Sequence, residues 1–192
     1  MKLSYIKELL RGRKTVLTIQ DMVVLFGLNR PYLRTVLGRL VARGDLVRVK
    51  RGLYLVQGKE ANFLEMAGKL KQPSYISLET VLANNGIVFQ DYSQTIFSVS
   101  NNTIKMKVLG KSFEYYKLKD DILLNPLGIE IKDGVMQASI ERAVCDRLYF
   151  SPGYYFDNLK KIDAANLLRV ANIYNNQRFQ KEIEKLARKI KE

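Results

Sequence analysis

The fold of the N-terminal part of the chain is decided by residues 18–43, which read TIQDMVVLFGLNRPYLRTVLGRLVAR. Thr18, with Asp21 three residues later, is typical of a capped helix start, and apolar residues follow at helical spacing. Gly27 favours the left-handed conformation that ends a helix, and Asn29 can cap the helix that follows. The stretch therefore predicts a short helix, a tight turn and a longer second helix.

The second helix is predicted to run from about Pro31 to Arg43 and to have two different faces. Its apolar face has residues at spacings of three and four, namely Leu33, Val36, Leu37, Leu40 and Val41. The opposite face and its flanks combine small side chains with cations: Arg30, Arg34, Thr35, Gly38, Arg39 and Ala42. Small residues between arginines allow close approach to another molecule, while the guanidinium groups can contact phosphates or guanine edges.

A basic hairpin is predicted directly after this helix. Residues 46–49 and 53–56 alternate as two short strands on either side of Lys50-Arg51-Gly52. An earlier helix over residues 3–10 completes the order helix, helix-turn-helix, hairpin. This is the order of a winged helix-turn-helix domain, in which the second motif helix enters the DNA major groove and the hairpin touches the backbone.

Positive charge is concentrated in the same segment. The chain has 192 residues, with 32 Lys and Arg against 19 Asp and Glu, a formal net charge of +13. Residues 1–58 contain 12 basic and 3 acidic residues and therefore carry +9, whereas residues 59–150 carry 0 and residues 151–192 carry +4. A local positive field attracts a polyanion, so nucleic acid is the expected partner of the first 58 residues. A solvated basic face without a partner is the alternative.

The composition excludes several kinds of site. The chain has no His and one Cys, which excludes a Ser-His-Asp triad, a His-ligated metal, a disulfide framework and a Cys-rich zinc site. We therefore expect no cofactor and no metal. The single Cys, and the absence of any run near the roughly 18 apolar residues of a membrane span, predict a cytoplasmic protein without signal peptide or membrane anchor.

The rest of the chain predicts a larger domain that mixes helices and strands. Its helices are expected at residues 60–71, 77–85 and 139–149 and in the tail. Its strands, a short meander and a hairpin, are expected at residues 95–100, 103–109, 112–118, 129–131 and 135–138. An apolar stripe from Phe179 to Ile190 can close onto its own domain or form a dimer contact.

The predicted fold class is therefore α+β. A winged helix-turn-helix domain of residues 1–58 precedes a mixed α+β domain of residues 59–192, which has a small antiparallel sheet and C-terminal helices.

Four segments in this order are similar to segments of one known family: Arg51–Tyr54, Ser74–Ile87, Gly110–Tyr116 and Ala138–Tyr149. Over about residues 15–150 the chain resembles AbiEi-type antitoxins of bacterial abortive-infection (type IV) toxin–antitoxin systems. It departs from the usual family pattern at Ile140, which replaces Pro, and at Arg142, which replaces Lys. The resemblance implies a non-enzymatic repressor of its own operon in phage defence, whose C-terminal domain counters a separately encoded nucleotidyltransferase-like toxin.

This interpretation assigns DNA contacts to eight residues of the first domain. Base edges or phosphates in the major groove would be contacted by Arg30, Arg34, Thr35 and Arg39. Flanking phosphates would be contacted by Arg48, Lys50, Arg51 and, from the side, Lys14. One such domain covers a short site, so useful specificity would need a dimer or two copies on an inverted repeat of double-stranded DNA.

Other functions are compatible with parts of the sequence. Glu130-Ile131-Lys132, with Asp120 or Asp121 upstream, has the residue types with which some nucleases hold a divalent ion. Lys132 also opens a Lys-Asp-Gly turn, so a solvated hairpin end is the simpler interpretation. Cys145 has apolar neighbours and no His to activate it, which predicts a buried structural thiol. A protein-interaction module, or a regulator without a toxin, is the remaining alternative.

Overall fold

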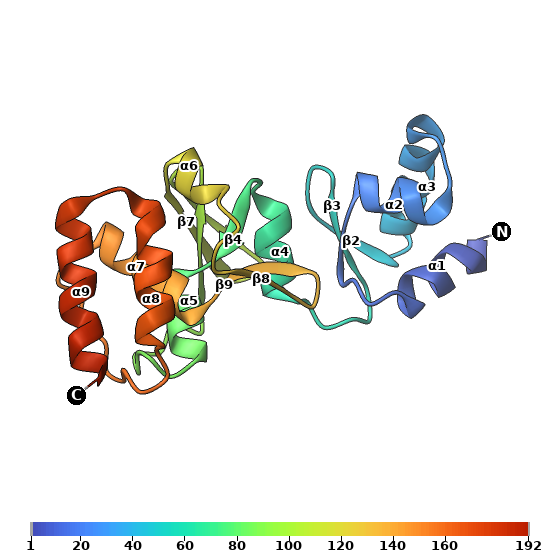
Figure 1. Ribbon diagram of the computed structural model, residues 1–192. Helices are drawn as coiled ribbons and strands as arrows, with labels where there is room; N and C mark the ends of the chain where they lie inside the picture. Colours follow the sequence, from blue (N-terminus) through green and yellow to red (C-terminus); the bar gives the residue numbers. More distant parts are fainter. Residues whose placement is uncertain (1, 192) are drawn as a thin grey trace. The chain divides into compact units, whose positions relative to one another are not determined.

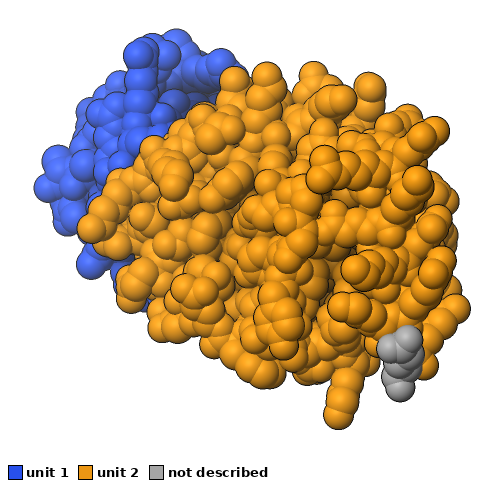
Figure 2. All heavy atoms as spheres, turned by 90° about the vertical axis from the view of Figure 1, so that its left-hand side faces the viewer, with its two compact units in different colours: residues 1–70 blue, residues 71–192 orange. Residues whose placement is uncertain are grey.

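A computed structural model describes residues 2–191 (Figure 1). The chain divides into two compact units, residues 1–70 and residues 71–192 (Figure 2). The first unit extends past Gly58, where the sequence placed the domain boundary, because helix α4 (Phe63–Leu70) belongs to it. Each unit contains its own β-sheet.

The first unit combines helices with a three-stranded antiparallel sheet of strand order β1-β3-β2. Before α4 its elements are α1 (Lys2–Arg11), β1 (Val16–Thr18), α2 (Ile19–Phe26), α3 (Arg30–Ala42), β2 (Leu46–Lys50) and β3 (Leu53–Val56). The helices and the hairpin were predicted. Strand β1 was not, because three residues are too few to show the alternation by which a strand is recognised.

The start and end signals of α2 and α3 are confirmed. The Thr18 hydroxyl accepts a hydrogen bond from the Asp21 backbone N–H, and the Asp21 carboxylate accepts one from the Thr18 N–H. Gly27 ends α2 in the left-handed region, with φ of 61°. The Asn29 side chain then accepts a hydrogen bond from the Tyr32 N–H at the start of α3. Local chemistry thus fixes both sides of the turn.

The apolar face of α3 is buried in the core of the first unit. This core takes residues from each element before α4: Leu9, Leu17, Met22, Leu33, Val36, Leu37, Leu40, Leu46, Tyr54 and Val56. Burial of aliphatic side chains is the main favourable contribution to folding. The core therefore orients α3, with its polar face in solvent.

The second unit is built on a six-stranded mixed sheet of strand order β6-β7-β5-β4-β9-β8. Its strands are β4 (Ser74–Ile76), β5 (Thr95–Ser100), β6 (Ile104–Val108), β7 (Lys111–Lys117), β8 (Ile129–Lys132) and β9 (Val135–Ala138). Its helices are α5 (Leu78–Asn84), α6 (Asp120–Leu123), α7 (Ile140–Phe150), α8 (Ala164–Ala171), the 3-10 helix η1 (Asn172–Tyr174) and α9 (Gln177–Lys191). Helices α7, α8 and α9 pack together at one side of this unit (Figure 1).

The prediction of a small antiparallel sheet is wrong. Strand β7 lies between β5 and β6, pairing in parallel with β5 and antiparallel with β6. The last four residues of β5 are buried, which suits a central strand, whereas β6 alternates exposed Lys105 and Lys107 with half-buried apolar residues, which suits an edge. Strand β4, which was not predicted, pairs with both β5 and β9 and joins the hairpin β8–β9 to the same sheet.

A buried ion pair lies at the centre of the second unit. The Asp146 carboxylate accepts hydrogen bonds from the hydroxyls of Ser77 at 2.6 Å, Tyr174 at 2.6 Å and Tyr75 at 3.0 Å. The Nε of Arg142 lies 3.5 Å from the same carboxylate, and both side chains are fully buried. Ser77 precedes α5 at the N-cap position, but its hydroxyl makes no cap hydrogen bond because it donates to Asp146.

Gly128 lies directly against this centre. Its φ is +75°, and a Cβ atom built on it would be 2.9 Å from the Cβ of Arg142 and 3.4 Å from the Ser139 hydroxyl oxygen. Its carbonyl accepts a 2.7 Å hydrogen bond from the Ser139 N–H, at the start of α7. Because glycine has no Cβ, the backbone just before β8 can lie directly against the start of α7.

The apolar stripe of α9 closes onto its own domain. Phe179, Ile183 and Ala187 are buried, and α9 contacts α8 and α7. Of the two uses expected for this stripe, the intramolecular one therefore accounts for its buried residues, while Leu186 and Ile190 are half-buried. None of the helices within residues 2–191 has both the length and the apolar character that a membrane crossing needs.

Candidate nucleic-acid interface

The solvent-facing side of α3 carries the residues assigned to the major groove. Arg34, Thr35 and Arg39 are exposed, whereas the apolar positions between them are buried. A Cβ atom built on Gly38 would meet no atom within 4 Å, so open space lies beside the helix between its cations. At the start of α3, an Nη of Arg30 donates to Gln20 Oε1 at 3.1 Å. The helix thus presents an accessible basic surface.

The hairpin β2–β3 carries the second group of predicted contacts, and these differ from one another. Arg48, Lys50 and Arg51 are all exposed. The Lys50 ammonium nevertheless donates a 2.6 Å hydrogen bond to the backbone carbonyl of Leu70, at the end of α4. Partial burial of its ammonium group lowers the pKa of Lys50. Lys50 therefore has a contact inside its own unit that the sequence did not predict.

Lys14 also makes an internal contact. Its ammonium lies 2.6 Å from the Asp21 carboxylate, the group that caps α2. The Lys14 side chain is 57% exposed, so this ion pair is open to solvent on one side. The clue in the sequence was the capping carboxylate itself, since an anion at a helix start attracts a nearby cation.

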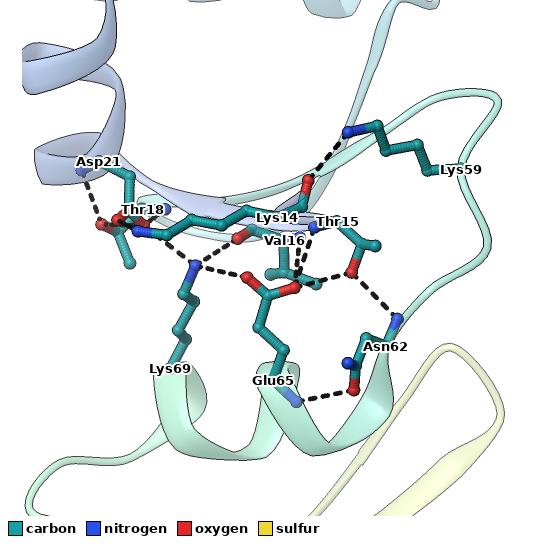
Figure 3. Close-up of polar contacts among 9 residues, drawn as sticks. All are labelled: Lys14, Thr15, Val16, Thr18, Asp21, Lys59, Asn62, Glu65 and Lys69. Carbon is teal, nitrogen blue, oxygen red and sulfur yellow. Dashed lines mark hydrogen bonds and ion pairs between the residues drawn. The ribbon is translucent and has the colours of Figure 1, made fainter. Parts of the chain in front are cut away.

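A polar network that the sequence did not predict joins α4 to β1 and to the start of α2 (Figure 3). One Glu65 oxygen accepts hydrogen bonds from the Thr15 N–H and hydroxyl, both at 2.9 Å, and from the Val16 N–H at 3.3 Å. The Lys69 ammonium lies 2.9 Å from Glu65 and 3.1 Å from Asp21. Helix α4 is therefore attached to β1 and to the start of α2.

The segment before α4 is attached to the same strand. The Asn62 N–H donates to the Thr15 hydroxyl at 3.0 Å, and the Asn62 side chain accepts from the Glu65 N–H at 3.0 Å, which caps α4 (Figure 3). The Lys59 ammonium donates to the backbone carbonyls of Gly12 and Lys14. Residues 59–62 are thus tied to the first unit by hydrogen bonds.

The electrostatics of this network favour ionised carboxylates. Burial raises the pKa of Asp21, but hydrogen bonds from Lys14 and Thr18 and the charge of Lys69 outweigh it, so the pKa lies well below its usual value of 3.8. For Glu65, burial likewise raises the pKa, and Lys69 and Thr15 bring it below its usual value of 4.5. Both groups therefore stabilise the folded state in their charged form.

The residues considered for a nuclease lie on exposed segments. Glu130 and Lys132 lie on β8 and form an ion pair with each other at 2.8 Å, while Asp120 and Asp121 lie in the first turn of α6. Within residues 2–191, no group of three or more His, Cys, Asp or Glu side chains is arranged to hold a metal ion. Cys145 is buried, as predicted, and burial raises the pKa of its thiol.

The segment that carries the basic residues of α3 and of the hairpin β2–β3 is similar to a known family. Residues 4–57 match the family described as "Transcriptional regulator, AbiEi antitoxin". This segment is therefore similar to that family. The AbiEi match spans α2, α3 and the hairpin and includes all eight predicted DNA-contacting residues. It confirms the resemblance noted in the sequence over this range. No curated protein matches the sequence of the chain.

The two carboxylates predict a pH dependence. Their folded-state pKa values lie below the unfolded values of 3.8 and 4.5, so their stabilisation is complete above those values and is lost as pH falls. We expect the unfolding free energy to decrease between about pH 5 and pH 3. Urea unfolding followed by circular dichroism measures it. Asp21→Asn should flatten this slope, and Glu60→Gln, at an exposed position, is the matched control. Equal slopes for wild type and Asp21→Asn would contradict the assignment.

Proposed function

We propose that this chain is a DNA-binding transcriptional repressor that acts as the antitoxin of a toxin–antitoxin operon. The observation that carries the proposal is the AbiEi match over residues 4–57, the segment in which α3 exposes its arginines. The AbiEi family is one of transcriptional regulators and antitoxins, and regulation of transcription implies binding to DNA. The net charge of +9 on residues 1–58 supports a polyanionic partner.

In this proposal the first unit binds DNA as a winged helix-turn-helix. Helices α2 and α3, with the capped turn between them, form the motif, and the hairpin β2–β3 is the wing. Helix α3 has 13 residues and is therefore about 20 Å long, enough to lie along the major groove. The buried apolar face of α3 leaves its basic face for the DNA.

The eight cationic and polar residues divide into three groups under this proposal. Arg34, Thr35 and Arg39 contact base edges, and Arg48 and Arg51 contact flanking phosphates. The remaining three have internal contacts in the structure: Arg30 with Gln20, Lys14 with Asp21, and Lys50 with Leu70. Lysine has three N–H donors, so Lys14 and Lys50 can add a phosphate contact without losing these bonds.

A plain regulator without a toxin partner is the second candidate. The AbiEi match ends at residue 57, so it does not extend into the second unit. The antitoxin part of the proposal, which assigns the second unit to counteracting a nucleotidyltransferase-like toxin, rests on the resemblance of the later segments alone. DNA binding and toxin neutralisation therefore need separate experiments.

The repressor is expected to bind the DNA upstream of its own gene. Fluorescence anisotropy with this duplex and with a scrambled duplex, across a salt series, should give at least about a thousandfold preference for the upstream DNA. Equal and steeply salt-dependent binding to both duplexes would leave only phosphate contacts, because counterion release is independent of sequence. No binding to either duplex would favour a protein-interaction module.

Arg34 is expected to contribute to sequence preference. Arg34→Ala should lose about 1–3 kcal/mol of binding to the upstream duplex and little to the scrambled one, if the guanidinium contacts a guanine edge with two hydrogen bonds. Arg51→Ala should weaken both duplexes about equally and reduce the salt slope by about one. Arg178→Ala is the control, because it removes the same charge from an exposed position on α9. An unchanged preference in Arg34→Ala would remove Arg34 from the base-contacting group.

The antitoxin activity is expected to show in growth. If a nucleotidyltransferase-like gene lies beside this one, its expression alone should arrest growth, and co-expression of the present chain should restore it. Both genes are placed under foreign promoters, so that their expression does not depend on the repressor. If the toxin is opposed without DNA binding, Arg34→Ala should restore growth as the wild type does. A neighbouring gene that is harmless when expressed would leave the plain regulator as the function.

A further inference from the structure

The two edges of the six-stranded sheet differ in how they are protected. The sheet ends in β6 on one side and in β8 on the other. On β6, exposed Lys105 and Lys107 alternate with half-buried apolar residues. Lysines on an edge strand are a common device against pairing with another chain. The β6 edge therefore has the features of a protected edge.

The β8 edge has a different surface. Ile131 is 75% exposed, and its cross-strand partner Met136 on β9 is 50% exposed. Partners in an antiparallel pair share a face of the sheet, and so do Ile129 and Ala138, the next pair on that face. Ala138 is buried, so this apolar face continues from the core out to the exposed hairpin. Such a face on an edge strand is suited to pairing with another strand.

The sequence of β8 is complementary to itself in the antiparallel direction. When Ile131 is placed opposite Ile131 of a second copy, Glu130 faces Lys132 of that copy, and Lys132 faces Glu130 of that copy. A register shifted by one residue places Lys132 opposite an isoleucine, and it places Glu130 opposite either Ile131 or the like-charged Asp133. Opposite charges in facing positions stabilise a strand pair, and like charges destabilise it. One register therefore combines the apolar and the ionic contacts.

We infer that β8 pairs antiparallel with β8 of a second copy of this chain, about a twofold axis at Ile131. A contact of this kind is isologous, since the same surface serves both copies. A second copy is favoured over a different partner because each β8 strand carries both Glu130 and Lys132. Two copies of the strand therefore provide the anion and the cation of each ion pair between them. In the apolar stripe of α9, the other surface considered for a dimer, Phe179 and Ile183 are already buried within their own unit.

The contact is small, and this determines how the dimer behaves. Strand β8 has four residues, so its edge supplies much less area than the roughly 1,200–2,000 Å² of a stable interface. The free protein therefore dimerises weakly and in a concentration-dependent way. Two copies held on neighbouring DNA half-sites would pair more readily, because binding side by side raises their effective concentration. This last step rests on the proposed function; the dimer itself does not.

The first experiment is a charge exchange, measured by sedimentation velocity over a concentration series without DNA. Glu130→Lys and Lys132→Glu each turn both ion pairs of the dimer into repulsive pairs, and each should raise the dimer Kd by about tenfold. The double variant Glu130→Lys/Lys132→Glu restores both pairs and should return the Kd to the wild-type value. Lys107→Glu makes the same charge change on the opposite edge of the sheet and should leave the Kd unchanged.

The second experiment traps the dimer at its predicted axis. In Ile131→Cys the new thiols of two copies face each other, so mild oxidation should give a disulfide-linked dimer on a non-reducing gel. Native Cys145, the one cysteine of the sequence, is buried and should give little background. Lys107→Cys, on the β6 edge, is the control and should give no disulfide-linked dimer. The substituted positions 107, 130, 131 and 132 are exposed, and circular dichroism verifies folding.

Two results would overturn the inference. One is a wild-type protein that stays monomeric at every concentration while Ile131→Cys fails to cross-link. The other is a dimer that the double charge exchange fails to restore. Both are measured without DNA, so they leave the proposed repressor function untouched. A protein that dimerises as described but binds no DNA would support the contact and contradict the repressor.

Discussion

One carboxylate, that of Asp21, connects three parts of the first unit. It accepts a hydrogen bond from the Thr18 N–H at the start of α2 and forms ion pairs with Lys14 and Lys69, so a single group joins α2 to the segment before it and to α4. Ion pairs of this kind contribute modestly when exposed, but these are partly buried and act together with several hydrogen bonds. The position of α4 within the first unit follows from this network.

Much of the first unit could be predicted because its signals are local. The caps at Thr18 and Asn29 and the glycine at position 27 act within one helical turn, and they place α2 and α3 as expected. The sheet of the second unit could not be predicted in the same way. The parallel pairing of β5 with β7 brings together strands that are not consecutive in the chain and are not joined by a single turn. Periodicity identifies strands but does not identify their partners.

The candidate site divides along the same line. Exposure of Arg34 and Arg39 follows from helical periodicity, because the opposite face of α3 is apolar. The hydrogen bond from Lys50 to Leu70 joins residues far apart in sequence, and nothing near either residue indicates it. Arg142 is a similar case: a polar residue near a helix start predicts exposure, yet Arg142 is fully buried because Asp146 and Tyr75 lie beside it.

Gly128 sets a limit on how this chain can diverge. A side chain at position 128 is opposed by the positive φ and by the Cβ of Arg142. A smaller residue at a neighbouring position can often make room for a larger side chain. Here the atom in the way is the Cβ of residue 142, which every amino acid except glycine carries. Residue 142 would itself have to become glycine inside α7, at a cost to the helix of about 1 kcal/mol in addition to the loss of the buried ion pair. Any other change at position 142 therefore cannot make room for a side chain at position 128 unless the backbone itself shifts.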